Sequence, residues 1–285
     1  MIAERDHKVI VRLKPKQQSD TVPGLLDGNR QWRVSLKFNR GMLLENNNDA
    51  LFIGSGDVSK GPYHLLLPQP QFALLRFWEV GRLVESRDGR LISEALVLES
   101  CDAGGYSTKI SKLSEIGAAF GFNVLSEFMR LEKMPTGLGF KAVQILAGEN
   151  VLPVLAHTLA EGGSRAELKK LVRYLVGRGQ GLTPSGDDFL VGLMAVMTNW
   201  TDLYTLVELL GLSTEATTTV SRCYFRQALR GHFDHDLTIM VKAMNKNWRK
   251  ALRIIFARIR AHGHSSGLDL LAGVLFALQI HCILS

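Results

Sequence analysis

The stretch "GRGQGLTPSGDDFLVGLM", Gly177 to Met194, decides how the second half of the chain is interpreted. Glycines, a proline and hydroxyl residues precede an apolar run, which predicts a loop followed by a helix. Ser185 is a natural N-cap, and Asp188 completes a capping box in which Asp replaces the usual Glu. Because capping alone does not require the glycines, the stretch also indicates a ligand that approaches the backbone N–H groups closely.

A second stretch, "HSSGLDLLAGVL" from His264 to Leu275, repeats the pattern S-G-x-D-x-L-x-G. The repeat matches Ser185 with Ser266, Gly186 with Gly267, Asp188 with Asp269 and Gly192 with Gly273. Chance or convergent capping would also produce such a pattern, but internal similarity favours a duplicated element. We therefore expect two neighbouring helices whose N-termini open on one cleft, and which pack closely at the second pair of glycines.

The repeat also predicts the chemistry of the ligand. Two helix N-termini present N–H donors and positive potential, which suit a phosphate or a carboxylate. Asp187, Asp188 and Asp269 stand in the same first turns. There they would cap the helices, accept hydrogen bonds from an NH₂ or ammonium group, or hold a cation such as Mg²⁺. A ligand that carries both an anionic group and an NH₂ group would satisfy both halves of the site.

The order of sequence patterns predicts an α+β chain. Short apolar or alternating runs indicate strands at Val9–Lys14, Trp32–Phe38, Met42–Glu45, Ala50–Gly54 and Tyr63–Leu67. Leu74 to Ser100 continues this pattern, with a turn at Asp88–Gly89. From Lys109 onward, apolar residues recur at helical spacing. We expect a mostly antiparallel, barrel-like β domain over residues 1–108, and an all-helical domain over residues 109–285 that carries both motifs.

Composition narrows the class of protein. The 285 residues are 46% hydrophobic and 21% charged, which suits a globular chain of one or two domains. The cysteines, Cys101, Cys223 and Cys282, are far apart and odd in number, so we expect a cytoplasmic protein without a disulfide framework. No apolar run reaches the roughly 20 residues of a membrane span. The net charge of +7 makes nucleic-acid binding a function to consider. However, the basic residues are scattered, and a solvated basic helix face explains them better.

The motifs "GxGxGLTPSGDD" and "GHSSGxD" resemble those of the oxamate carbamoyltransferase subunit (AllH) family. The segment "GSGDVSKGPYHLLL", Gly54 to Leu67, is similar to a weaker motif of that family. The resemblance implies a β-rich part before a helical part. It also implies a multi-subunit enzyme of allantoin degradation that interconverts oxalurate plus phosphate with oxamate plus carbamoyl phosphate. Departures at Gln180, Ser265 and Leu270 leave the identity of the substrate open.

These arguments yield one candidate site and two classes of function. The expected catalytic residues are His264, Asp187, Asp188 and Asp269, and the expected substrate-binding residues are Gly181, Thr183, Ser185, Gly186, Ser265, Ser266 and Gly267. In the enzyme hypothesis the backbone N–H groups bind the anionic end, the aspartates orient the NH₂ end, and His264 assists proton transfer. The alternative is a non-catalytic binding or assembly subunit whose partner chains carry the chemistry. A homo-oligomer is compatible with either hypothesis.

Other motifs favour structural explanations. In "GHFDHDL", Gly231 to Leu237, Asp234 caps a helix more readily than the cluster binds a metal. The arginines that recur every four residues, Arg222, Arg226 and Arg230, form a solvated basic stripe on a helix, or one of them binds the anionic group of the ligand. His264, Ser266 and Asp269 are too close in sequence for a hydrolase triad, and the glycine-rich turn around Lys60 lacks the Walker pattern.

Overall fold

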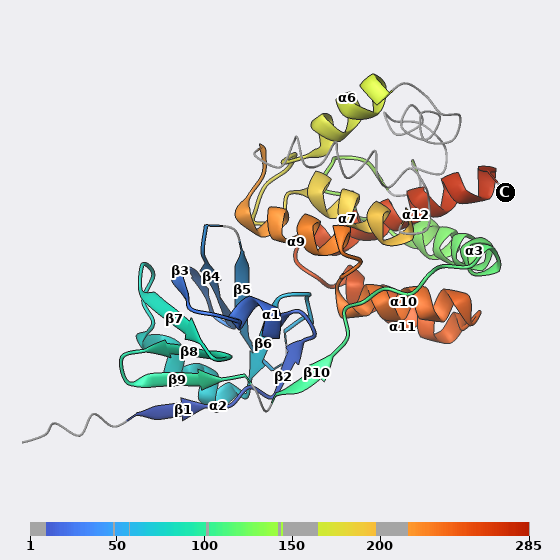
Figure 1. The fold of residues 1–285 in the computed structure, drawn as a ribbon. Coiled ribbons are helices and arrows are strands. Elements are labelled where there is room, and N and C mark those ends of the chain that lie inside the picture. The colour runs from blue at the N-terminus through green and yellow to red at the C-terminus, as the bar shows by residue number, and fades with distance from the viewer. Residues whose placement is uncertain are drawn as a thin grey trace, which may run out of the picture. The chain divides into compact units, whose positions relative to one another are not determined.

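The computed structural model describes residues 10–47, 49–56, 58–100, 103–141, 144, 165–197 and 216–284. The chain forms two compact units, Met1–Thr108 and Lys109–Ser285. The first unit is a curled sheet, and the described part of the second unit is helical, so the expected α+β class is confirmed (Figure 1). Most of the apolar segment 139–162, as well as Trp200 and Cys101, lies outside the described residues.

The β unit is built on one ten-stranded sheet of order β1-β9-β8-β7-β3-β4-β5-β6-β2-β10. Its strands are β1 (Val11–Leu13), β2 (Gln17–Ser19), β3 (Arg30–Phe38), β4 (Gly41–Glu45), β5 (Ala50–Ser55), β6 (His64–Leu67), β7 (Leu83–Arg87), β8 (Arg90–Ser93), β9 (Leu96–Glu99) and β10 (Gly104–Tyr106). Six of the nine strand pairs are antiparallel, and β1–β9, β5–β6 and β2–β10 are parallel.

The sheet curls because of one short connection. Only residues 14–16 separate β1 from β2, yet β1 lies at one edge of the sheet and β2 lies next to the other edge. Three residues span roughly 10 Å at most, so the two ends of the sheet must approach each other. A hydrogen bond also joins the two ends of the sheet, because the side-chain amide of Gln18 in β2 donates to the carbonyl of Ser100, just after β9. The expectation of a barrel-like sheet is confirmed as a curled, half-barrel form.

The structure agrees with the prediction from the sequence at one turn and differs from it at one predicted strand. Asp88 and Gly89 have φ of 50° and 71°, which is the combination of a type I′ hairpin turn between β7 and β8. By contrast, the strand pattern predicted from Leu74 is wrong at its start. Pro70 lies in the first turn of α2 (Gln69–Phe72), and the chain continues as the 3₁₀ helix η1 (Ala73–Phe77). A further short helix, α1 (Val22–Leu26), also contains a proline near its start.

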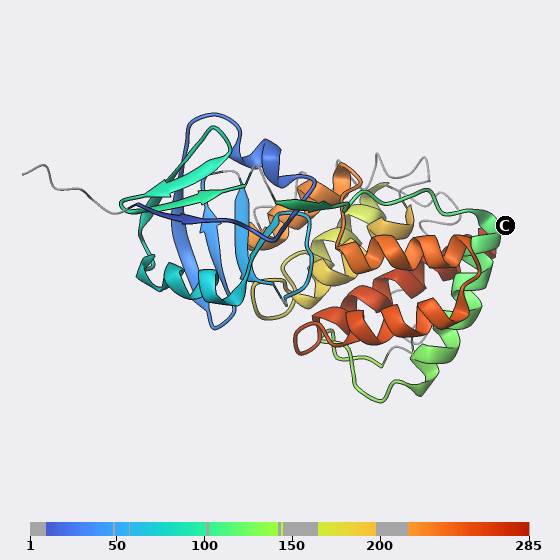
Figure 2. The same cartoon turned by 90° about the horizontal axis from the view of Figure 1, so that it is seen from below.

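The described helices of the second unit are α3 (Glu115–Leu131), α6 (Arg165–Leu175), α7 (Ser185–Met197), α9 (Thr219–Leu229), α10 (His235–Asn245), α11 (Arg249–Arg260) and α12 (Ser266–Leu284). Every residue of α7 is buried, and from Phe189 onward the helix is apolar on all sides. The yellow α7 and the red α12 run side by side at the centre of this unit (Figures 1 and 2). None of the described helices is long and apolar enough to cross a membrane.

Two glycines set the distance between α7 and α12. A Cβ at Gly192 would overlap the carbonyl oxygen of Leu270, and a Cβ at Gly273 would overlap that of Phe189. The two contacts are reciprocal, because Gly192 matches Gly273, and Phe189 matches Leu270, in the sequence repeat. The helices are therefore related by an approximate two-fold operation. The expectation that these glycines allow close helix packing is confirmed.

Replacing Gly192 with Ala should destabilise the protein by about 1–3 kcal/mol or more, because the backbone of α12 cannot move aside as a side chain can. Gly121→Ala is the matched control in α3. Its Cβ would contact only the flexible side chain of Met244, so the effect should be smaller. Urea unfolding of both variants measures the difference. Equal stability of the two variants would contradict backbone contact at Gly192.

Candidate functional site

The N-termini of α7 and α12 lie next to each other and exchange side-chain contacts. The Ser266 hydroxyl, at the start of α12, donates to Asp188 in the first turn of α7. In the same way, the Ser185 hydroxyl, at the start of α7, donates to Asp269 in the first turn of α12. Thr183 lies 3.4 Å from Ser266 between their hydroxyl oxygens. The expectation that the two motifs are neighbours is confirmed, and each motif contacts the aspartate of the other.

The backbone N–H groups of both first turns are engaged within the chain. The amides of Gly186 and Gly267 donate to the carbonyls of Arg178 and His262, at 2.9 and 3.0 Å. The next two amides of each helix donate to Pro184 and Ser265 respectively, at 2.8 to 3.1 Å. These three donors of each helix, which the sequence suggested for an anion, therefore already have partners within the chain.

The glycines of the motifs have structural explanations. A Cβ at Gly186 would overlap the carbonyl of Leu175 at the end of α6, and a Cβ at Gly267 would overlap that of Ile259 near the end of α11. Gly179 and Gly181 have φ of 118° and 95°, in the region that favours glycine. Gly181 is exposed, and no atom lies within 4 Å of the position its Cβ would take. Of the motif glycines, it is the one that leaves room for a ligand beside the backbone.

Asp187 differs from its neighbour. Its carboxylate accepts from the Gly177 amide at 2.8 Å and from the Thr217 hydroxyl. It therefore ties the glycine-rich loop to the start of α9. Burial raises its pKa although these hydrogen bonds oppose the change. With both oxygens engaged, Asp187 acts as a structural anchor in the ligand-free chain.

Asp188 and Asp269 form the chemically unusual part of the site. Asp269 is fully buried and Asp188 is 9% exposed. The Oδ2 atom of each carboxylate is buried without a hydrogen-bond partner of normal geometry among the described residues. Burial raises the pKa of both groups, and the charge of Asp269 adds to the increase at Asp188, whose pKa lies well above its ordinary value. A buried acceptor without a donor costs about 1–3 kcal/mol, so these two oxygens favour a ligand that donates hydrogen bonds.

The motif residues fall within the region shared with a known family. Residues 175–278 match the family model of the oxamate carbamoyltransferase subunit AllH. The resemblance expected from the two motifs is thus confirmed over this segment of the helical unit. The AllH match includes Asp188 and Asp269, whose Oδ2 atoms lack hydrogen-bond partners among the described residues. It does not extend to Gly54–Leu67, the segment with the weaker resemblance. No solved structure matches the chain.

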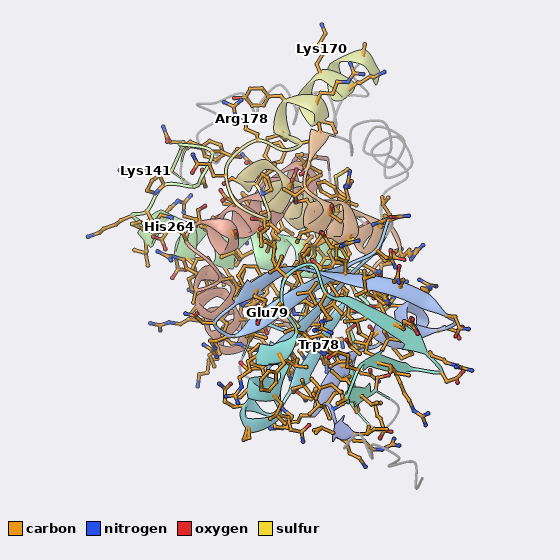
Figure 3. The ribbon with its side chains drawn as sticks, turned by 90° about the vertical axis from the view of Figure 1, so that its left-hand side faces the viewer. Trp78, Glu79, Lys141, Lys170, Arg178 and His264 are labelled. Atoms are coloured by element: carbon orange, nitrogen blue, oxygen red, sulfur yellow. The ribbon has the colours of Figure 1, made fainter. Side chains whose placement is uncertain are left out.

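His264 lies in the loop before α12 and is exposed. Figure 3 shows it on the same face of the helical unit as two other basic residues, Lys141 and Arg178. Arg178 is exposed as well, and its guanidinium lies 4.0 Å from the centre of the Tyr174 ring. Arg178 and Lys141 are thus exposed cations on the same face of the helical unit as His264.

A loop that the sequence did not single out completes the site. Pro135 and Lys141 pair as an isolated β-bridge, so the segment after α3 forms a tight hairpin. At its tip, the amides of Gly137 and Leu138 donate to Asp269, the first at 2.8 Å. Ser265 donates to the same carboxylate. The turn sequence "PTGLG" predicts a loop here, but the contact spans 132 residues and has no local signal.

The other clusters have local partners. Asp234 caps α10 through the amide of Asp236, as expected, and burial raises the pKa of Asp234 to about 7. Asp236 lies 2.6 Å from a guanidinium nitrogen of Arg258. Among the described residues no group of three or more His, Cys, Asp or Glu side chains could hold a metal ion. A polar groove of about 810 Å³ lies on the β unit between Arg30 and Glu45, and none of the motif residues lines it.

Asp187→Asn should keep the fold, since the Gly177 amide retains an acceptor and the Thr217 hydroxyl can turn to accept from the new amide. Asp187→Ala removes both acceptors and should cost about 1–3 kcal/mol or more in the free energy of unfolding. Thermal melting of the two variants beside the wild type measures this. A large loss of stability in the Asn variant would show that the negative charge itself is needed.

Proposed function

We propose that the chain is a subunit of an oxamate carbamoyltransferase and that its helical unit binds the amide-bearing substrate. The observation that carries the proposal is the pair of buried carboxylate oxygens, Asp188 Oδ2 and Asp269 Oδ2, that lack donors where two motif helices begin. Both lie inside the segment that matches the AllH family model.

The chemistry of an amide fits these acceptors. A planar NH₂ group has two N–H donors, and two oxygens from different helices can accept one each. Hydrogen bonds from a neutral NH₂ group to an ionised carboxylate contribute about 1.5–3 kcal/mol in favourable geometry. An ionised carboxylate would in turn repel a ligand whose NH₂ group is replaced by a negatively charged oxygen. We therefore assign the NH₂ end of oxamate, or the carbamoyl group itself, to Asp188 and Asp269.

The anionic end of the substrate is assigned to exposed basic residues. Arg178 follows the end of α6 at the edge of the first motif, and its guanidinium can bind a carboxylate or a phosphate through two hydrogen bonds. His264 precedes Ser265 and Ser266, and it is placed to polarise a carbonyl or to transfer a proton. The hydroxyls of Thr183, Ser185, Ser265 and Ser266 provide donors that can turn towards either carboxylate.

A second function is favoured by two observations. Asp187 has hydrogen-bond donors within the chain, and the paired glycines of both motifs pack against backbone carbonyls of other segments. Both observations fit a motif whose role is purely structural. In that case the helical unit is an assembly or binding module, and partner subunits carry the chemistry. A cation such as Mg²⁺ between Asp188 and Asp269 is the other occupant that would satisfy their oxygens.

Calorimetric titration of the purified chain with oxamate tests the proposal, and oxalate is the matched ligand without an NH₂ group. We expect oxamate to bind and oxalate to bind at least about 10-fold more weakly, which corresponds to ~1.4 kcal/mol. Asp188→Asn should weaken oxamate binding by about 10- to 100-fold because one charged acceptor is lost. Carbamoyl transfer by the reconstituted subunits should fall with it.

Glu127→Gln is the control, since it removes a carboxylate from the exposed face of α3, where Glu127 pairs with Arg249. It should leave oxamate binding unchanged. Titration with MgCl₂ alone separates the cation from the amide. Equal binding of oxamate and oxalate, or unchanged binding by a folded Asp188→Asn variant, would count against the amide site and in favour of an assembly role.

A further inference from the structure

The two aspartates of the repeat match in sequence but not in their donors. Asp269 accepts the Gly137 amide on Oδ1 at 2.8 Å, and the Leu138 amide and the hydroxyls of Ser185 and Ser265 also act on this carboxyl group. Among the described residues, the donors that act on Asp188 are hydroxyls, those of Ser266 and Thr183. A backbone N–H can only donate, so it always requires an acceptor opposite it. A hydroxyl can either donate or accept, so it tolerates a carboxylate and a carboxylic acid equally well.

The amides at Asp269 are held in place by the hairpin. The Thr136 amide donates to the Phe140 carbonyl at 2.8 Å, and the Gly139 amide donates to Thr136 at 3.0 Å. Leu138 and Phe140 pack against the core of the helical unit. Gly137 itself packs against the site, since a Cβ there would overlap the Ser185 hydroxyl oxygen and would lie 2.7 Å from the Ser265 hydroxyl oxygen and 3.0 Å from Asp269 Oδ2. The hairpin therefore cannot turn its donors away without leaving its packing.

The charges around Asp188 oppose a second negative charge. The groups that act on it electrostatically are Asp269 from α12 and Asp187 from its own helix, and both are carboxyl groups. Burial adds to the cost of ionising it. When two neighbouring carboxyl groups cannot both be ionised at low cost, their surroundings decide which one keeps a proton. Here the donors favour an ionised Asp269 and a protonated Asp188.

We propose that the two aspartates have different roles: the hairpin Pro135–Lys141 holds Asp269 as a permanent carboxylate that positions the substrate nitrogen, and Asp188 is the member that gains and loses a proton. Gly137 is then a positioning residue, at which a side chain is not tolerated. This assignment rests on the proposed amide site and divides its chemistry between the two motifs.

With these roles, every bond and proton of the carbamoyl transfer can be followed. When the nitrogen of an amide acceptor such as oxamate attacks carbamoyl phosphate, a nitrogen–carbon bond forms and the carbon–oxygen bond to phosphate breaks. The bonding pair leaves with the phosphate. The N–H bond of the attacking nitrogen breaks, and its proton passes to Asp188, while Asp269 accepts the remaining N–H. In the reverse direction Asp188 returns the proton to the departing nitrogen, and phosphate is the nucleophile.

The first test needs no ligand. Melting temperatures of Asp188→Asn, Asp269→Asn and the double variant are measured from about pH 4 to pH 9, and each single variant, which keeps one of the two carboxyl groups, is compared with the double variant at every pH. A carboxyl whose pKa is raised by folding makes the variant that keeps it lose stability, relative to the double variant, as pH rises from the unfolded pKa to the folded pKa. We expect this loss to continue to a higher pH for Asp188 than for Asp269. The same pH range for both residues, or the reverse order, overturns the proposal.

Gly137→Ala tests the hairpin directly. The added Cβ should lift the Gly137 and Leu138 amides from Asp269, so the Asp269 difference curve, measured in this background, should extend to higher pH. Gly139→Ala is the control for strain in the hairpin, because Gly139, unlike Gly137, has a positive φ of 86°, and no atom lies within 4 Å of its Cβ position. A shift that is equal in both backgrounds would assign the effect to strain in the hairpin and contradict a positioning role for Gly137.

The second test uses oxamate as the probe. Calorimetry in buffers of different ionisation enthalpy gives the number of protons released on binding. We expect wild type and Asp269→Asn to release protons as Asp188 becomes an acceptor, and Asp188→Asn to release none. If wild type does not bind oxamate, the proposed function fails, while the pH comparison without ligand still decides whether the two aspartates differ. If wild type binds and only Asp269→Asn abolishes proton release, the roles are assigned wrongly.

Discussion

Backbone contact between α7 and α12 is the constraint on which the helical unit depends. At Gly192 and Gly273 no side chain separates the two helices, and each glycine faces a carbonyl of the other helix. With the helix axes this close, the first turns also meet, and the aspartate of each motif comes within reach of the serine of the other. The site is a consequence of the crossing. A larger residue at either glycine would move all four side chains apart.

The same crossing explains why the site contains acidic groups that are difficult to ionise. Acidic residues in the first turn of a helix normally remain near solvent, where a carboxylate is well hydrated. Here two first turns cover each other, and the hairpin after α3 covers Asp269 as well. Asp187, one residue before Asp188, avoids the problem because the loop before α7 and the start of α9 supply it with donors. Aspartates with raised pKa values thus arise where the first turns of two helices are buried together.

The sequence predicts the classes of structure better than it predicts the roles of residues. Period-two and helical spacing locate most strands and helices, and the repeat correctly predicts that α7 and α12 are neighbours. The repeat also suggested that Gly186 and Gly267 admit a ligand, whereas their missing side chains make room for the carbonyls of Leu175 and Ile259. Both purposes require the absence of a Cβ, so sequence alone does not separate them. Likewise, nothing local connects Gly137 with Asp269, because their contact depends on how the whole unit packs.

The complete burial of α7 has a consequence for the nascent chain. Each of its thirteen residues is covered in the folded unit, and its main covering element, α12, begins only at Ser266. While the ribosome synthesises the residues between them, α7 is an apolar segment without its partner, and such segments aggregate or recruit chaperones. The yield of the folded helical unit in a cell should therefore depend on chaperone supply more strongly than the yield of the β unit does. In the β unit, strands β3, β4 and β5 pair within a short stretch of chain.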